Sequence, residues 1–184
     1  NLTHAGLQQL IDKYLVKDRS TGKTYETPQF AYMLIVMTAF MDHEDKDERL
    51  KHVKKLYDFI SLQKISLPTP IVAGIRTPNR QYSSCTLIEV EDSLDSLFNA
   101  NTAIGQYVAK RAGIGINAGS LRALGSKIRN GEVVHTGVIP FLKMFQSTLH
   151  SCSQGGIRKG SATVYFPWWH LEIEDVLVLK NNKG

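Results

Sequence analysis

Long hydrophobic runs, cysteines and clustered histidines are all scarce in this sequence of 184 residues. Its most apolar stretch, residues 30–41, is broken by Thr38 and is too short to span a bilayer. The first residues lack the charged and then apolar order of a secretory signal. The six histidines are scattered, so no spacing indicates a metal site. These absences predict a cytoplasmic chain that binds neither a membrane nor a metal.

Cysteine occurs only twice, as Cys85 and Cys152. In a secreted protein the two could pair, but in a cytoplasmic protein free thiols are the default. Cys85 falls in a run of strand-forming residues, where a cysteine is most often an inert buried thiol. On spacing alone, the residues indicate no chemistry for either thiol.

Acidic residues are nearly absent between residues 96 and 171, where Glu132 is the only one. The basic residues in the same stretch are Lys110, Arg111, Arg122, Lys127, Arg129, Lys143, Arg158 and Lys159. This local excess, within an overall net charge of +5, indicates an anionic partner: a phosphate group, a nucleic acid or an acidic surface. A solvated basic face is the alternative explanation.

The first part of the sequence has the apolar spacing of helices. Residues 7–15 are typical of the inside of a helix, and residues 50–60 are typical of an amphipathic helix. Between them, Thr27 and Pro28 are typical of a helix start, and the apolar residues that follow leave no polar face. We therefore predict a buried helix there and assign residues 1–62 to an N-terminal helical region.

Short strands alternate with helices from residue 63 onward, which favours a mainly parallel α/β arrangement over residues 63–184. Pro68 and Pro70 are expected to hold an extended backbone around Thr69. The predicted strands cover residues 82–90, 112–119 and 162–167. The predicted helices cover residues 92–110 and 136–151.

The predicted helix over 92–110 carries an apolar stripe along its length. Its members are Leu94, Leu97, Phe98, Asn101, Ile104 and Val108, with Asn101 as a polar break. Such a stripe usually packs into a core. Together with the helix over 136–151, for which Thr136 is the expected N-cap, it could also form an interface between two chains. Further on, Trp168 and Trp169 are expected to be buried, although they could instead stack on a base.

The stretch with the most unusual composition is S-C-S-Q-G-G-I-R-K-G-S-A-T, residues 151–163. Its glycines allow positive φ and close approach by a ligand, and two adjacent cations follow them. Neither this stretch nor A-G-I-G-I-N-A-G at 112–119 has the glycine spacing of a P-loop or a dinucleotide-binding motif. Both still place glycine-rich backbone beside cations, which suits phosphate binding. We predict a recognition loop over 151–163, with Arg122 and Arg129 as further phosphate contacts.

Several motifs, taken in order, resemble one enzyme family. They are Y-S-S-C at 82–85, R-A-G-I-G-I-N-A-G at 111–119, H-T-G at 135–137, the glycine-rich loop at 151–163, P-W-W-H-L-E at 167–172 and L-K-N-N-K-G at 179–184. With them, essentially the whole chain resembles the large, catalytic (alpha) subunit of class I ribonucleotide reductase, of the bacterial and bacteriophage type. The resemblance implies an α/β fold. An N-terminal fragment of that subunit would supply a helical region and about the first half of a ten-stranded α/β barrel.

The resemblance implies an oxidoreductase that reduces ribonucleoside diphosphates to deoxyribonucleoside diphosphates for DNA replication. Cys85 would be one of two redox-active cysteines that become a disulfide, which thioredoxin or glutaredoxin later reduces. The partner cysteine, the radical-bearing cysteine and the catalytic glutamate would lie beyond residue 184, so the chain alone would be inactive. The implied substrate-binding residues are Thr69, Ser84, Cys85, Gly113 and Arg158.

The resemblance also implies allosteric control by ATP and deoxynucleotide effectors. The effector-binding residues would be Asp92, Ser93, Leu94, Arg122 and Arg129. A coupling loop between effector and substrate would consist of Cys152, Ser153, Gln154, Gly155, Gly156, Arg158, Lys159 and Gly160. Two positions depart from the family pattern. Ala109 replaces a hydroxyl near the effector and Lys159 replaces a common glycine, so we assign no effector contact to Ala109 and leave the substrate rules of the loop open.

The resemblance implies three protein partners. They are the remaining C-terminal part of the large subunit, a second copy joined through the helices over 92–110 and 136–151, and a small subunit whose di-iron centre generates the radical. The chain itself would bind no cofactor, no membrane and no nucleic acid. Two alternatives are a nucleotide-binding regulatory or assembly module without catalysis, and a basic nucleic-acid binder whose affinity would fall steeply with salt.

Overall fold

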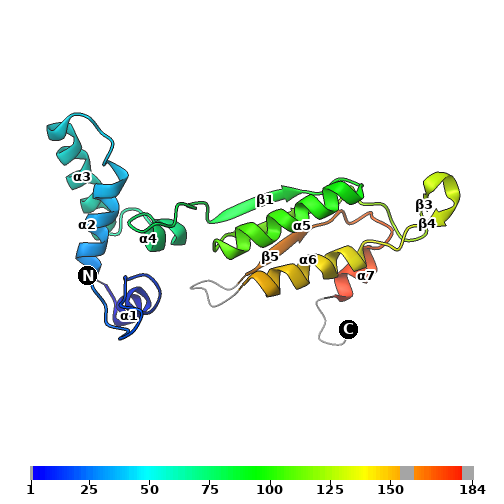
Figure 1. Ribbon diagram of the computed structural model, residues 1–184, viewed down its shortest axis with the longest axis horizontal. Helices are drawn as coiled ribbons and strands as arrows, with labels where there is room; N and C mark the ends of the chain where they lie inside the picture. The colour runs from blue at the N-terminus through cyan, green and yellow to red at the C-terminus, as the bar shows by residue number, and fades with distance from the viewer. Residues whose placement is uncertain (1, 154–159, 180–184) are drawn as a thin grey trace. The chain divides into compact units, whose positions relative to one another are not determined.

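Figure 1 shows the computed structural model of the chain, which describes residues 2–153 and 160–179. Contacts between residues divide the chain into two compact units, Asn1–Ser84 and Cys85–Gly184. Residues 63–84 therefore make their contacts with the first unit. The domain boundary predicted after residue 62 stays a prediction.

Helices make up the first unit: α1 (His4–Lys13), α2 (Pro28–Ala39), α3 (Lys46–Ser61) and the short α4 (Thr69–Gly74). The first three begin after Thr3, Thr27 and Asp45, whose side chains accept hydrogen bonds from first-turn N–H groups. At Asp45 these hydrogen bonds, from the N–H groups of Glu48 and Asp47, lower the pKa of the carboxyl. Helices α1 and α3 were predicted from apolar spacing and α2 from its Thr27–Pro28 start, and all three are confirmed.

Helix α2 buries only one side, so the prediction of a helix buried all round is wrong. Ala31, Ile35 and Val36 are buried, whereas Phe30 and Met37 are 66% and 51% exposed. Helices α3 and α4 pack against α2, and within the first unit the described residues leave Phe30 and Met37 on another side of α2 exposed. An apolar composition did not predict burial here, because burial depends on which neighbours surround the helix.

The segment around Thr69 is helical rather than extended. Pro68 has the extended backbone of a helix N-cap position, with φ −67° and ψ 148°, and Thr69 is the first residue of α4. Pro70 lies in the first turn, where proline is tolerated because the N–H groups there have no partner within the helix. The predicted extended backbone is therefore correct for Pro68 and wrong for Thr69.

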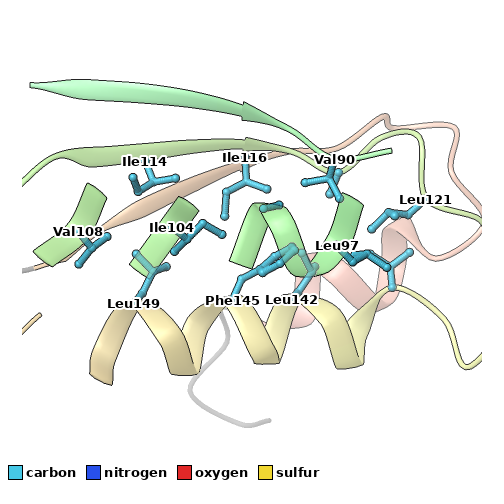
Figure 2. Packing of buried hydrophobic residues seen from close by; sticks show 13 residues of the cluster. Val90, Leu97, Ile104, Val108, Ile114, Ile116, Leu121, Leu142, Phe145 and Leu149 are labelled. Carbon is cyan, nitrogen blue, oxygen red and sulfur yellow. The ribbon is translucent and has the colours of Figure 1, made fainter. Parts of the chain in front are cut away.

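A three-stranded parallel sheet organises the second unit, in the order β1 (Cys85–Glu89), β2 (Gly113–Asn117) and β5 (Ala162–Tyr165). Helix α5 (Leu94–Ala109) connects β1 to β2, and α6 (Ile139–Cys152) precedes β5. Both helices lie on the same side of the sheet, as Figures 1 and 2 show. The predicted alternation of strands and helices in a parallel α/β arrangement is confirmed.

The core of the second unit lies between the sheet and the two helices, as Figure 2 shows. It consists of Val90, Leu97, Ala100, Ile104, Val108, Ile114, Ile116, Ala118, Leu121, Val138, Leu142, Phe145 and Leu149. Burial of each Val, Leu, Ile or Phe side chain in this core stabilises the fold by about 1.5–3 kcal/mol. The apolar stripe predicted on α5 divides, because Leu97, Ile104 and Val108 enter this core while Leu94 and Phe98 are 57% and 55% exposed.

Within the second unit, no described helix covers the opposite face of the sheet. Side chains alternate along a strand, so Cys85 and Leu87 point to this face while Ile88 packs against the core. Leu87 is 77% exposed. A Cβ atom on Gly115 of β2 would lie 2.6 Å from Cδ2 of Leu87, which shows how closely the two strands' residues approach on this face.

Three short elements complete the second unit. A two-stranded hairpin joins β3 (Lys127–Ile128) to β4 (Val133–Val134) through the 3-10 turn η1 (Arg129–Gly131). After β5, the chain turns into α7 (Ile173–Val178). The indole rings of Trp168 and Trp169 pack edge to face, but the residues are 78% and 72% exposed, so their predicted burial is wrong. A local aromatic pattern does not determine which neighbours cover it.

Candidate functional site

Cys85 is the first residue of β1 and pairs in register with Gly113, the first residue of β2. Its thiol is free and the residue is exposed, which contradicts the ordinary expectation of an inert buried cysteine. Beside Gly113, the N–H of Ile114 donates to the carbonyl oxygen of Ser161 at 3.1 Å. The amino ends of the three strands therefore bring Cys85, Gly113 and the last part of the glycine-rich loop, Ser161 and Ala162, to one end of the sheet (Figure 1).

Thr69 lies in the first unit, where its Oγ1 is 3.3 Å from the hydroxyl of Tyr14. A buried ion pair stabilises the same region: the side chains of Arg76 and Glu26 are 4% and 6% exposed, and Arg76 Nε donates to Glu26 Oε2 at 3.0 Å. Burial by itself would raise the pKa of Glu26, but hydrogen bonds from Arg76 and from the N–H of Val16, with the charge of Arg76, lower it. Arg76 also donates to the carbonyl of Tyr14 at 3.1 Å, so this network positions the residues around Thr69.

Asp92 and Arg122 form a salt bridge at the carboxyl end of the parallel strands, which is the end of the sheet opposite Cys85. Arg122 Nε donates to Asp92 Oδ2 at 2.6 Å, and the Arg122 N–H donates to Oδ1 at 3.2 Å. The two residues follow β1 and β2, and open α/β sheets bind ligands at the carboxyl ends of their strands. Ser93 caps α5 by accepting from the N–H of Ser96 at 3.2 Å, and Leu94 begins that helix. The positive end of the α5 dipole therefore lies beside the salt bridge.

Arg129 lies on the neighbouring hairpin, at the start of η1, with a left-handed φ of 49°. Arg122 contacts this hairpin through its Nη1, which is 3.5 Å from the carbonyl oxygen of Lys127. Within the described part of the chain, no hydrogen bond or salt bridge joins Arg129 to Asp92 or Arg122. Four of the five predicted effector residues are thus brought together, Arg129 is not joined to them by any described hydrogen bond or salt bridge, and the effector role of all five stays a prediction.

Only the two ends of the predicted coupling loop are described. Cys152 is the last residue of α6, and Ser153 follows it and accepts a hydrogen bond from the N–H of Gly160. Gly160 has no space for a side chain, because its Cβ would lie 2.8 Å from Cγ1 of Val108 and 3.0 Å from the carbonyl of Leu149. The other predicted members lie outside the described residues: Gln154, Gly155, Gly156, Arg158 and Lys159.

Helices α5 and α6 approach closely at the end that leads into this loop. A Cβ on Gly105 would lie 3.2 Å from Sγ of Cys152 and 3.3 Å from Cγ2 of Thr148. The hydroxyl of Thr148 donates to Oδ1 of Asn101 at 2.7 Å. This hydrogen bond explains the polar break in the apolar stripe of α5, because the amide has a partner on the facing helix.

The start of α6 differs from the start that the sequence predicts. Thr136 is not its cap; Val138 occupies the N-cap position and makes no side-chain cap. Its N–H instead donates to the carboxylate of Glu172, which lies 34 residues further along the chain. The only signal was Glu172 itself, an acid in an otherwise apolar and aromatic motif (P-W-W-H-L-E), and its partners could not be found without the tertiary structure.

Among residues 2–153 and 160–179, no group of three or more His, Cys, Asp or Glu side chains is arranged to hold a metal ion. No helix in the same ranges combines the length and the apolar character that crossing a membrane requires. The described residues place an exposed thiol, Cys85, at one end of the parallel sheet and the Asp92–Arg122 salt bridge at the other end.

Residues 1–80 match the family described as "Ribonucleotide reductase, all-alpha domain", and residues 83–184 match "Ribonucleotide reductase, barrel domain". The chain belongs to the ribonucleotide reductase family. The helical first unit and the parallel α/β second unit agree with these two descriptions. The resemblance and the fold class inferred from the sequence are thereby confirmed.

Curated relatives support the same assignment. The chain is 61% identical over 183 residues to the ribonucleoside-diphosphate reductase subunit alpha of Enterobacteria phage T4. It is 58% identical over 182 residues to the ribonucleoside-diphosphate reductase subunit alpha of Haemophilus influenzae, and 57% identical over 182 residues to the ribonucleoside-diphosphate reductase 1 subunit alpha of Escherichia coli K12. Each alignment covers 99% of this chain but only 24% of the relative. The chain therefore corresponds to part of a large-subunit sequence in this family.

Proposed function

We propose that this chain contributes one reducing thiol and one effector site to a ribonucleoside-diphosphate reductase. The observation that carries the proposal is the exposure of the Cys85 thiol at the amino end of β1, beside Gly113. A thiol that is free, exposed and placed beside a glycine is accessible to a sugar, whereas a buried structural cysteine is not. Together with a second cysteine from the rest of the subunit, it would supply two electrons and become a disulfide.

The same edge of the sheet would bind the substrate. Gly113 presents backbone without a side chain next to Cys85, and Ser84 directly precedes that cysteine. We assign Thr69 and Arg158 to the same substrate on the family likeness. The substrate would be a ribonucleoside diphosphate, and the reaction would belong to deoxyribonucleotide synthesis in the cytoplasm. The remaining C-terminal part of the subunit, a small subunit with a di-iron radical centre, and thioredoxin or glutaredoxin would complete the reaction.

The salt bridge of Asp92 and Arg122 supports an effector site for ATP or a deoxynucleoside triphosphate. A guanidinium group and a helix N-terminus suit phosphate groups, and a carboxylate suits a sugar hydroxyl. The exposed side chains of Leu94 and Phe98 on α5 support a second proposal, a homodimer formed through α5 and α6. In that dimer the effector site would lie beside the helices that join the two copies.

The first experiment replaces Cys85 by Ser in the assembled reductase and measures deoxynucleoside diphosphate formation with a dithiol reductant. Turnover is expected to be lost, because serine cannot give up electrons to form a disulfide. Ser83→Ala, at the exposed position two residues earlier, is the matched control and should keep parental turnover. Full activity of Cys85→Ser would overturn the proposal.

A second candidate is a nucleotide-binding regulatory or assembly module without catalysis. It is favoured by one observation: Asp92, Ser93 and Arg122 are assembled within this chain without residues from elsewhere. The two candidates differ when the complementary C-terminal polypeptide is supplied. Restored turnover supports the reductase, whereas nucleotide binding without turnover supports the regulatory module.

A further inference from the structure

Glu172 is a buried carboxylate, 6% exposed, that joins two separate segments of the second unit. Its Oε2 accepts a hydrogen bond from the N–H of Leu124 at 2.9 Å and another from the N–H of Val138 at 3.1 Å. Gly137 makes room for it: φ is +90°, and a Cβ there would lie 2.5 Å from Oε1 of Glu172. The carboxylate thus binds the loop after β2 and the first turn of α6 at the same time.

His170 binds the same loop from two residues earlier. Its Nε2 lies 2.8 Å from the carbonyl oxygen of Leu121, and its Nδ1 accepts from the N–H of Glu172 at 3.1 Å. A carbonyl oxygen only accepts, so Nε2 must carry the proton and the imidazole is neutral in this arrangement. The ring also packs against Phe166, with centroids 4.5 Å apart. His170 therefore has one orientation in which all its hydrogen bonds are made.

Arg122 lies between the two anchored positions. Leu121 is bound through its carbonyl group and Leu124 through its N–H group, so the backbone that carries Arg122 is restrained on both sides. Its side chain then reaches Asp92 at 2.6 Å. Neither His170 nor Glu172 touches Asp92 among the contacts of the described residues, so any influence on that site passes through the loop 121–124.

We propose that His170 and Glu172 are positioning residues for the nucleotide effector site, and that Glu172 also connects this site to the start of α6. This inference rests on the proposed function, which places the effector at Asp92 and Arg122. Of the two residues, Glu172 is the one that contacts α6, through the N–H of Val138 at the start of that helix.

The test measures binding of a deoxynucleoside triphosphate to the assembled large subunit by equilibrium dialysis. Glu172→Gln keeps the size of the side chain but replaces one carboxylate oxygen by an NH2 group, which faces the N–H of Val138 and cannot accept from it. The dissociation constant of the deoxynucleoside triphosphate is therefore expected to rise about tenfold. Glu174→Gln is the matched control, because it makes the same charge change at an exposed position two residues on. Its dissociation constant should equal that of the parent.

His170 provides a second pair of variants in case Glu172→Gln folds poorly. His170→Phe keeps an aromatic ring against Phe166 but loses the donor to Leu121, so effector binding should weaken about tenfold. His170→Gln can still donate from its amide nitrogen and should restore most of the affinity. Rescue by Gln, which packs less well than Phe, separates positioning from simple packing.

Two further readouts distinguish positioning from general stability. At saturating effector, the KM for the nucleoside diphosphate should be unchanged in Glu172→Gln. In an Arg122→Ala background, Glu172→Gln should weaken effector binding little further, because the residue through which it acts has been removed.

The outcomes separate the inference from the function on which it rests. Parental effector affinity in both Glu172→Gln and His170→Phe, or a lower thermal unfolding temperature without a change in affinity, overturns the inference and leaves the effector site intact. Absence of deoxynucleotide binding by the unaltered subunit overturns the proposed effector site and the inference together.

Discussion

At the scale of single residues, the two buried carboxylates Glu26 and Glu172 satisfy their charge in different ways. Glu26 has a charged partner, Arg76, with both side chains nearly excluded from water. Glu172 accepts from backbone N–H groups and has no cation among its hydrogen-bond partners in the described residues. Loss of Glu26 therefore leaves a buried charge behind, whereas loss of Glu172 leaves unpaired N–H groups.

Replacing Glu26 by Gln is expected to lower the free energy of unfolding by about 3–5 kcal/mol, because Arg76 remains buried without its counter-charge. Urea denaturation followed by circular dichroism measures the change. Glu48→Gln is the control, because Glu48 pairs with Lys51 on the surface, where both side chains are largely exposed. The free energy of unfolding of Glu48→Gln should lie within about 0.5 kcal/mol of that of the parent. Equal small effects of both substitutions would contradict the structural account.

The pH dependence of the same variant tests the cause. The pKa of Glu26 is lowered in the folded chain, so its contribution is complete above the ordinary glutamate value of about 4.5 and is lost as the pH falls through the folded pKa. The parent should therefore lose stability more steeply than Glu26→Gln below about pH 4.5. Parallel curves for parent and variant would show that the ion pair does not contribute.

At the scale of elements, helix starts show which features the sequence can reveal. Thr27 with Pro28, and Ser93, could be recognised because the cap and its partner N–H lie within three residues of each other. The start of α6 could not be recognised, because the N–H of Val138 at that start donates to Glu172, which lies 34 residues further along the chain. Local chemistry reports local hydrogen bonds, and long-range partners appear only when the chain is folded.

The cap of α2 gives a prediction for one element. Thr27→Ala should lower the free energy of unfolding by about 1 kcal/mol, because the N–H of Phe30 loses its acceptor. Thr27→Ser keeps a hydroxyl in the same place, so its free energy of unfolding should equal that of the parent. Thermal unfolding of the parent and both variants provides the measurement. Equal melting temperatures for Ala and Ser would show that the cap bond contributes nothing.

At the scale of the whole molecule, the sequence pattern predicted the helical first part and the parallel α/β second part, and the family resemblance implied the grouping of Asp92, Ser93 and Arg122. The sequence pattern did not predict exposure. Trp168 and Trp169, and one side of α2, are apolar but exposed, because burial is a property of what surrounds a residue and not of the residue itself. The chain spans 24% of the length of the phage T4 subunit alpha. Surfaces that are exposed here are therefore candidates for contact with the rest of such a subunit.

The sheet of the second unit makes this argument testable. Strands β1 and β5 are its edges, and each presents unpaired backbone groups on its outer side among the described residues. Leu87 and Tyr165 add apolar surface, at 77% and 54% exposure, to the face that no described helix of the second unit covers. Open parallel edges and an uncovered apolar face favour association with other strands. The 184-residue chain alone is therefore expected to aggregate, and the complementary C-terminal polypeptide should suppress the aggregation.

Sedimentation velocity measures both states. The expected result is a broad distribution of large species for the chain alone, replaced by one discrete complex when the complementary polypeptide is present during refolding. An unrelated protein of similar charge, added at the same concentration, controls for nonspecific rescue. A discrete species that is unchanged by the complementary polypeptide would contradict the argument, because it would show that the three-stranded sheet is stable with both edges and one face open to solvent.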